Sequence, residues 1–412
     1  MSASGTQAQA LFPHHTDSDV LHRDVVIIGA GPAGLSFARA VAASGLRITV
    51  VEKSPATVLA DPPYDGREIA LTHKSKEIMQ ALDMWQRVDE HEIYKLKDAK
   101  VVNGRSGYQL HFPQPKSARG KPTDTLGYLI SNHNIRRAAY AAVQTCTNIE
   151  LLCGVGVKDV HTDKEAATVN LEDGRRLHAK LLVAADSRFS QTRRQLGIAA
   201  DMHDFGRTVI VFRMRHSVSN QHSAFECFHY GRTLALLPLE ENLTNCVVTI
   251  DSHRADSLLK LSPEALAADI EQQLQGRLGS MTLASTLHTY PLVGVHANAF
   301  HAQRSALVGD AAVGMHPVTA HGFNLGLESA DILARLVNQA AQKGQDIASG
   351  SLLAQYQREH MRNTRPLYHG TNLMVRLFTN EAPPAKVLRS LILRVSNNLP
   401  PIKHLISRQL TG

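Results

Sequence analysis

The sequence predicts an α/β fold in which one domain is assembled from separated segments, next to a β-rich second domain and a helical C-terminal region. Three observations predict this organisation. An apolar strand, a helix and a second apolar strand follow one another in residues 24–53, in the pattern of a βαβ unit, which implies a parallel sheet covered on both faces. Segments with strand-like alternation lie between residues 207 and 253. The apolar segment 305–310 then returns to α/β character, and the rest of the chain from about Gly326 is largely of helical pattern.

Length and composition permit this organisation and exclude several others. The chain has 412 residues, of which 43% are hydrophobic and 20% charged, unlike a disordered or fibrous protein. The four cysteines form no CxxC pair, which indicates reduced thiols, and no apolar run is long enough to predict a membrane-spanning helix. The net charge of +7 is thinly spread, so we expect no nucleic-acid partner. The polar residues 1–23 are expected to form a disordered tail.

Three glycines, Gly29, Gly31 and Gly34, form a GxGxxG motif where the first strand meets its helix. In such a motif the first glycine permits a tight turn, the second lets the backbone approach a pyrophosphate, and the third lets helix and strand pack closely. Glu52 ends the second strand, where a carboxylate can accept hydrogen bonds from the ribose hydroxyls of an adenosine. The arrangement predicts a dinucleotide site, and both NAD and FAD fit it.

Two later motifs favour FAD. An apolar strand ends at Gly309 and Asp310, where a carboxylate can bind the ribityl hydroxyls of a flavin. A loop then runs through Pro317 to Gly322 and leads into a helix near Asn324, whose N-terminal amides can face the pyrimidine edge of the flavin ring. A third apolar strand, between these motifs in the sequence, ends at Asp186, which we also expect to contact the cofactor.

With these motifs the sequence resembles the FAD-dependent aromatic hydroxylases of the p-hydroxybenzoate hydroxylase type, the class A flavin monooxygenases. Within that group it is most similar to the ubiquinone-biosynthesis hydroxylases. The matching segments are GAGPAG with Glu52, AADSRFSQTRRQLG, and GDAAVGMHPVTAHGFNLGLESA. The resemblance implies flavin contacts from Arg67 and Arg136, and we include Lys53, beside Glu52, among the expected cofactor-binding residues.

The resemblance also implies a domain organisation. We expect a Rossmann-like FAD-binding domain built from separated segments, a β-rich substrate domain, and a helical C-terminal region. The FAD-binding domain is expected to comprise residues 24–72, 100–198 and 286–345, the substrate domain residues 73–99 and 199–285, and the helical region residues 346–412.

The sequence departs from the family pattern at two places. Ser187 stands where the family has the glycine of its Asp-Gly motif, and Ala320-His321-Gly322 replaces Gly-Gln-Gly. His321 is therefore either a pocket residue that hydrogen-bonds substrate or flavin, or a structural substitute for the missing glutamine. His316 and His321 are the candidates for pocket shaping or proton handling, and no histidine pair has the spacing of a metal site.

The activity implied by the resemblance is hydroxylation of an aromatic ring, with NAD(P)H as a transient electron donor and O₂ activated as a flavin C4a-hydroperoxide. The expected substrate is a hydrophobic polyprenylated phenol or quinol of ubiquinone biosynthesis. Two alternatives stay open. One is a small soluble aromatic acid, for which Arg213, Arg215 and Tyr230 are candidates for a carboxylate clamp. The other is a non-catalytic flavoprotein in a biosynthetic complex.

The expected location is the cytoplasm, with the C-terminal segment as a candidate for peripheral contact at the inner membrane face. Residues 385–410 carry Leu, Ile and Val at helical spacing, with Lys and Arg between them. That pattern suits a membrane surface, a partner protein of the ubiquinone-biosynthesis complex, or a helix packed on its own domain.

Overall fold

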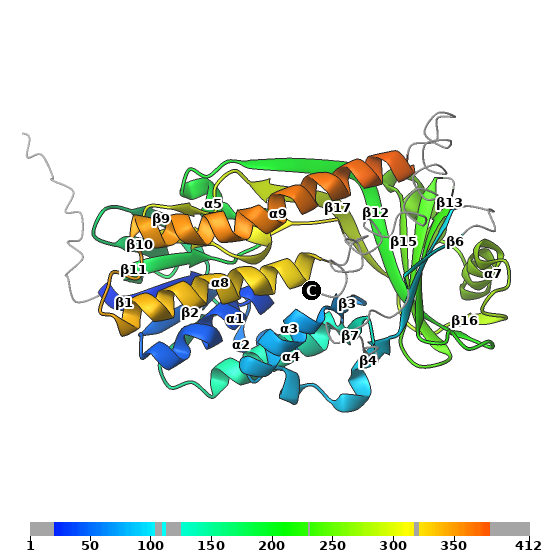
Figure 1. The fold of residues 1–412 in the computed structure, drawn as a ribbon, viewed down its shortest axis with the longest axis horizontal. Helices are drawn as coiled ribbons and strands as arrows, with labels where there is room; N and C mark the ends of the chain where they lie inside the picture. Colours follow the sequence, from blue (N-terminus) through cyan, green and yellow to red (C-terminus); the bar gives the residue numbers. More distant parts are fainter. Residues whose placement is uncertain (1–19, 104–108, 113–124, 230, 317–320, 380–412) are drawn as a thin grey trace, which may run out of the picture.

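The computed structural model describes residues 20–103, 109–112, 125–229, 231–316 and 321–379. They form two large sheets and a small one, and the long helix α9 (Gly350–Thr379) extends from the first large sheet toward the second (Figure 1). The α/β class expected from the sequence is confirmed.

The main path of the first large sheet has the order β18-β19-β11-β1-β2-β8, and its neighbours pair in parallel except β18 and β19. Two further strands join this sheet by antiparallel pairing beside β11. Its central strands are sealed on both faces, as their apolar sequences require. The strands are β1 (Val20–Ile28), β2 (Ile48–Glu52), β8 (Ile149–Cys153), β11 (Arg176–Ala184), β18 (His301–Ala302) and β19 (Ser305–Leu307).

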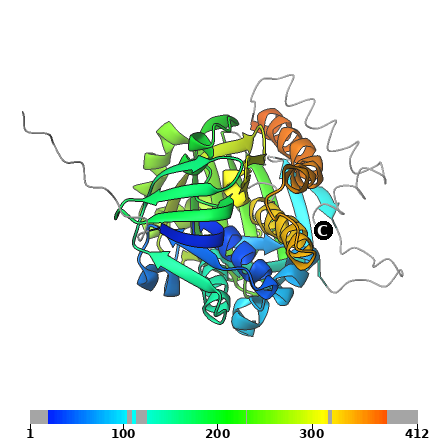
Figure 2. The same ribbon diagram turned by 90° about the vertical axis from the view of Figure 1, so that its left-hand side faces the viewer.

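Different layers cover the two faces of this sheet. Alternate residues such as Val25 and Ile27 form one core with the helices α1 (Pro32–Val41), α4 (Asn132–Gln144), α8 (Gly322–Gln342) and α9. Val26 and Ile28 form a second core with the antiparallel strands β9 (Val157–Thr162) and β10 (Ala167–Leu171). Figure 2 shows this strand layer beside the helices. A helix layer on one face and a strand layer on the other thus bury the sheet.

Shorter elements complete this part of the molecule. A small antiparallel sheet has the order β3-β7-β4, and Thr72 and Ser131 cap the helices α3 and α4 that follow β3 and β7. The bounds are β3 (Glu68–Leu71), β4 (Tyr94–Leu96), β7 (Gly127–Ser131), α2 (Ala56–Ala60), α3 (His73–Ala81), α5 (Gln191–Gln195), η2 (Ala42–Ser44), η3 (Trp85–Arg87), η4 (Glu90–Glu92) and η5 (Gly309–Ala311).

The second large sheet has the order β20-β17-β12-β15-β14-β13-β5-β6, and β16 also pairs with β12. One face packs on α6 (Ser252–Leu259) and α7 (Pro263–Leu274) through a separate hydrophobic core. The other face looks toward the first sheet (Figure 1). The strands are β5 (Asp98–Asn103), β6 (Gln109–Phe112), β12 (Ala200–His216), β13 (Ser223–His229), β14 (Arg232–Pro238), β15 (Leu243–Asp251), β16 (Met281–Leu283), β17 (His288–Ala297) and β20 (Val313–Gly314).

The pairing differs from the expected domain boundaries. Strands β5, β6 and β17, expected almost wholly in the FAD-binding domain, belong to the second sheet, because β5 pairs with β13 and β17 pairs with β12. Helix α3, expected in the substrate domain, packs in the core of the first sheet. Strand β1 begins at Val20, so the first ordered strand starts before Asp24. Residues 1–19 and 380–412 lie outside the described residues.

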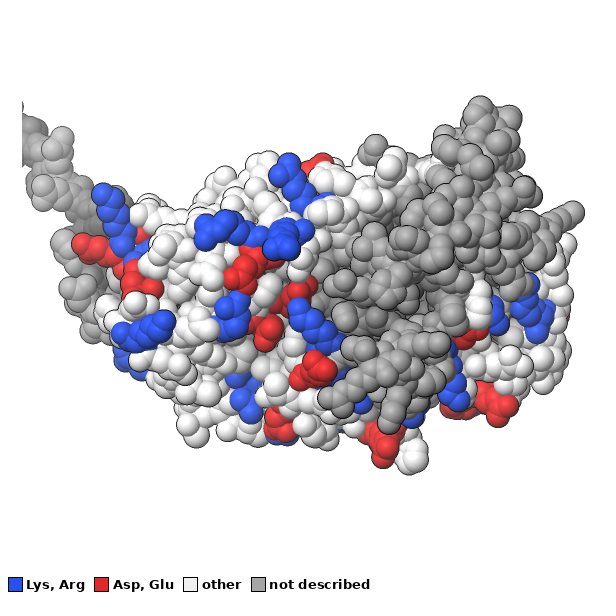
Figure 3. Space-filling model, in the orientation of Figure 1, with Lys and Arg blue, Asp and Glu red and all other residues white. Residues whose placement is uncertain are grey.

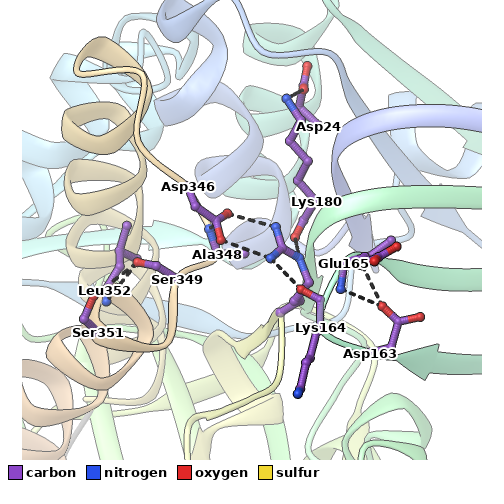
Figure 4. Close-up of polar contacts among 12 residues, drawn as sticks. Asp24, Asp163, Lys164, Glu165, Lys180, Asp346, Ala348, Ser349, Ser351 and Leu352 are labelled. Carbon is purple, nitrogen blue, oxygen red and sulfur yellow. Dashed lines mark hydrogen bonds and ion pairs between the residues drawn. The ribbon is translucent and has the colours of Figure 1, made fainter.

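Polar contacts fix α9 and the segment that precedes it to the first sheet. Arg304 donates to both carboxylate oxygens of Asp346, at 2.8 and 3.0 Å, and to the backbone oxygen of Lys180, and Lys180 pairs with Asp24 at 2.8 Å (Figure 4). Farther along, Tyr356 of α9 donates to the carbonyl of Leu307 in β19. Helix α9 is thereby held against the first sheet near the Gly-Asp motif.

Candidate functional site

The GxGxxG turn has the geometry that its three glycines predict. Gly29 has φ of +104°, and a Cβ there would lie 2.5 Å from the carbonyl oxygen of Ala185. A Cβ on Gly34 would lie 2.1 Å from the carbonyl oxygen of Gly29, so helix α1 can approach the strand only without a side chain. A Cβ on Gly31, in contrast, would have nothing within 4 Å. The space above Gly31 is therefore open to a ligand.

Glu52 lies at the end of β2, beside this turn. Its Oε2 accepts a hydrogen bond from the Ala30 N–H at 2.8 Å, and its Oε1 accepts one from the Ser54 N–H at 2.9 Å. The two bonds fix the carboxylate next to the glycine turn and leave lone pairs for a further donor. The side chain of Lys53 is exposed just beyond the strand end.

Asp186 follows β11 and binds its own chain. Its carboxylate accepts hydrogen bonds from the Ser190 and Thr192 hydroxyls and from the Thr192 N–H, and so holds the start of α5. Ser187 has φ of 152°, a conformation that L residues rarely adopt. The turn is thus retained although serine replaces the family glycine.

Asp310, in η5, lies opposite this segment. Arg188 donates to its Oδ2 from Nη2 at 2.9 Å and from Nε at 3.2 Å, and the carboxylate stays partly exposed. Gly309 has φ of +60°, and its N–H donates to the Ser329 hydroxyl at 3.0 Å. The ion pair joins the Asp-Gly segment to the Gly-Asp segment.

The three motifs meet at one edge of the first sheet. The Gly29 turn lies against Ala185, at the end of β11. A Cβ on Gly309 would lie 2.7 Å from the Ala33 Cβ of α1, and one on Gly326 of α8 would lie 3.3 Å from the Gly309 Cα. Segments separated by up to about 290 residues therefore form one surface at the carboxyl ends of β1, β2, β11 and β19, where doubly wound sheets bind ligands.

The N-terminus of α8 is tied to the small sheet. The Asn324 Oδ1 accepts from the Thr72 N–H at 3.2 Å and from the Ser75 hydroxyl at 2.6 Å, while its Nδ2 donates to the Ala70 carbonyl at 2.8 Å. His321 is the buried N-cap residue of α8, and Gly322 is its first residue. Pro317 lies outside the described residues.

Arg67 lies in the segment that enters β3. It forms an ion pair with Asp65 at 2.6 Å, and its guanidinium lies over the Tyr290 ring, 5.2 Å from the centroid. The Arg67 carbonyl accepts from the Asn132 N–H at 2.8 Å, so this segment lies beside the first turn of α4. Arg136 is one turn farther along α4 and is partly buried.

His316 is buried next to the second sheet. Its ring meets the Phe205 ring edge-on at a centroid distance of 5.1 Å. Burial, with a smaller effect of the Arg207 charge, lowers the pKa of His316 to about 4. The imidazole is therefore neutral near pH 7, which favours pocket shaping over the role of a charged proton donor.

The two arginines considered for a carboxylate clamp are both paired with carboxylates of the chain itself. Arg213 is paired with Glu68 of β3 at 2.5 Å and lies over the Tyr64 ring, whereas Arg215 pairs with Glu240 at the surface. Tyr230 lies outside the described residues. Glu68 was not among the residues predicted from the sequence, although a charged residue at the start of the otherwise apolar segment EIAL was the available signal.

A family model described as an FAD binding domain matches residues 22–368. The chain belongs to this FAD-binding family. It is 64% identical over 392 residues to the ubiquinone hydroxylase UbiM of Neisseria meningitidis, covering 95% of this chain and 85% of that protein. It is 30% identical over 410 residues to the ubiquinone hydroxylase UbiL of Rhodospirillum rubrum, and this match covers 100% of this chain and 94% of that protein.

A solved structure supports the fold of this FAD-binding protein. The structure of PqsL from Pseudomonas aeruginosa, in complex with 2-aminobenzoylacetate, matches with a TM-score of 0.74 at 21% identity, covering 87% of this chain and 97% of that one. The two chains thus share their architecture, and together with the hydroxylase relatives this makes the protein an FAD-dependent aromatic-ring monooxygenase.

The residues present fit FAD. The N-cap residues of α1 and α8 are Gly31 and His321, and neither helix has a side-chain hydrogen bond at its cap or an acidic residue in its first turn. Uncapped helix N-termini favour anionic groups, here the pyrophosphate and the pyrimidine edge of the flavin. Within the described part of the chain, no group of three His, Cys, Asp or Glu side chains is arranged to hold a metal ion.

Proposed function

We propose that this protein hydroxylates the aromatic ring of a polyprenylated phenol or quinol in ubiquinone biosynthesis, with FAD, NAD(P)H and O₂. The observation that carries the proposal is the 64% identity to a ubiquinone hydroxylase over nearly the whole chain. The pairing of Arg213 with Glu68 supports it, because a neutral ring needs no free cation in the substrate domain.

FAD supplies the redox chemistry when bound, taking a hydride from NAD(P)H and allowing one oxygen atom of O₂ to reach the substrate ring. The protein binds and orients it. The open N-terminus of α1 would hold the pyrophosphate, Glu52 the adenosine ribose, and Asp310 the ribityl chain. The amides at the start of α8 would face the pyrimidine edge, where they favour negative charge on the reduced ring.

Other residues position these groups. Asn324 fixes the start of α8 against residues 70–75, so the helix N-terminus cannot move away from the small sheet independently. Arg188 orients Asp310. Neutral, buried His316 and its neighbour Phe205 would exclude water on the side of the second sheet, which protects the coupling of NAD(P)H oxidation to hydroxylation.

The quinone profile of cells lacking this protein tests the proposal. We expect one or more under-hydroxylated prenylated intermediates to accumulate, and complementation with the wild-type gene to remove them. An unchanged profile would contradict the ubiquinone assignment. In that case NAD(P)H-dependent hydroxylation of a small phenol would indicate the soluble-substrate alternative, and retained FAD without NAD(P)H-dependent oxygen consumption would indicate a non-catalytic flavoprotein.

The same proposal includes peripheral contact with a membrane or a partner of the biosynthetic complex. Its support is the alternation of apolar and basic residues in 385–410, and the apolar character of a prenylated substrate. Among the described residues, no helix is long and apolar enough to cross a membrane. Flotation of the full chain and of a 1–380 truncation with anionic liposomes tests the membrane contact, and equal flotation would remove it.

A further inference from the structure

The substrate-domain sheet carries a carboxyl group that the mechanism above does not use. Glu226 of β13 pairs with Ala235 of β14, and the same row of paired residues continues through Val247 to Val211. Residues directly opposite in a sheet share a face. Val211 lies against Gly66, where a Cβ would approach its Cγ2 to 2.8 Å. Glu226 is therefore on the face that looks toward the cofactor-binding part of the chain.

The residues directly opposite Glu226 on the two adjacent strands are apolar. Its Oε1 is buried without a hydrogen-bond partner, and Val101 and Ala235 lie opposite it on the adjacent strands. Arg213 is on β12, three strands away, which corresponds to roughly 14 Å across the sheet. Burial raises the pKa of Glu226 to about 8. The group is therefore a neutral carboxylic acid near pH 7, able both to donate and to accept a hydrogen bond.

The face that holds Glu226 is partly exposed around this residue. Residues on the side packed on α6 and α7 are buried, whereas Glu226 and some of its neighbours on the other side are partly exposed; Val211, farther along the same row, is buried. Buried residues on the first side are Phe225, Cys227, Leu234, Leu236 and Cys246; partly exposed residues on the second are Ala224, Glu226, Ala235, Leu237 and Val247. The two alanines beside the carboxyl, Ala224 and Ala235, have the smallest side chains of this group.

We propose that Glu226 hydrogen-bonds a ring oxygen of the aromatic substrate and thereby selects a neutral phenol or quinol over an aromatic acid. This inference rests on the proposed function, which supplies a neutral, oxygenated ring. A buried carboxyl without a partner is costly, and a ring hydroxyl removes that cost by pairing with it. A substrate carboxylate would instead place a negative charge beside Val101 and Ala235, while Arg213 of this sheet is already paired with Glu68.

Binding of two matched probes to the FAD-loaded enzyme tests the inference. The probes are 2-geranylphenol and its methyl ether, which differ only in the ring O–H, and binding is followed by the change in flavin absorbance. We expect the wild type to bind the phenol about 10-fold more tightly, as loss of one buried hydrogen bond of about 1.4 kcal/mol predicts. Glu226→Leu should abolish the preference, and Glu226→Gln should retain part of it.

Glu241→Gln is the matched control, because Glu241 is an exposed carboxylate in the same domain; it should bind both probes as the wild type does. FAD content and far-UV circular dichroism establish that each variant is folded. An unchanged preference in both Glu226 variants overturns the inference. A wild type that hydroxylates the phenol but binds the phenol no more tightly than its methyl ether also overturns the inference. The proposed function then stands. A wild type that neither binds nor hydroxylates the phenol contradicts the proposed function and the inference together.

Discussion

Replacing Gly31 and Gly34 separately by alanine should separate cofactor binding from folding. At Gly34 the new methyl group would lie 2.1 Å from the Gly29 carbonyl oxygen, so α1 must move by more than 1 Å to restore an ordinary contact near 3.4 Å. Overpacking of this kind costs roughly 1–3 kcal/mol. At Gly31 the methyl group meets nothing within 4 Å, and φ of −70° suits any residue, so the apoprotein should unfold at the same or a slightly higher urea concentration.

The FAD affinity should fall in both variants. At Gly31 the methyl group occupies the open space assigned to the pyrophosphate, and we expect the FAD dissociation constant to rise at least about 10-fold, or about 1.4 kcal/mol. Urea unfolding of the apoproteins and fluorescence titration with FAD measure the two quantities. A Gly31→Ala protein that binds FAD as tightly as the wild type would refute the placement of the pyrophosphate.

Three further predictions follow from other contacts. Glu68→Gln removes the anionic partner of Arg213, so the affinity of the protein for 4-hydroxybenzoate should rise in equilibrium titrations. An unchanged affinity would contradict the neutralisation of Arg213 by Glu68. Ser187→Gly should stabilise the protein by about 1 kcal/mol in urea unfolding, because φ of 152° strains serine; an unchanged midpoint would show that the turn is unstrained. Burial lowers the pKa of His360 to about 4, below its unfolded value of about 6.5, so stability is lost as pH falls through this window. The free energy of unfolding should therefore fall by about 2 kcal/mol less between pH 7.5 and pH 5 in His360→Phe than in the wild type. An equal fall in the wild type and the variant would contradict this.

The local elements were predictable because their signals are local. The apolar runs of β1, β2 and β11 and the glycines at 29, 31 and 34 specify buried strands and a tight turn without reference to distant residues. Burial on both faces was also predicted. The strand layer of β9 and β10 was not, because a short alternating strand does not reveal which face it will cover.

Long-range pairing was the part that sequence reasoning missed. The pairing of β5 with β13 joins residues 98–103 to 223–228, and the sequence of neither strand identifies the strand with which it pairs. The same holds for Glu68 and Arg213, which are 145 residues apart. The bonds of the Asp186 carboxylate to Ser190 and Thr192 were also not predicted, because they depend on the conformation of the following turn. Its contact with the cofactor stays a prediction. Figure 3 shows acidic and basic residues interspersed on one face, which agrees with the thin spread of the net charge.

Incorporation of labelled oxygen tests the central claim most directly. The FAD-loaded protein is supplied with NADH or NADPH, ¹⁸O₂ and 2-geranylphenol, and the product is analysed by mass spectrometry. A monooxygenase predicts a product with one additional oxygen atom, carrying the ¹⁸O label on the ring, in proportion to the NAD(P)H consumed. NAD(P)H oxidation that yields only labelled hydrogen peroxide and leaves the ring unchanged, or a product whose new oxygen comes from water, would contradict it.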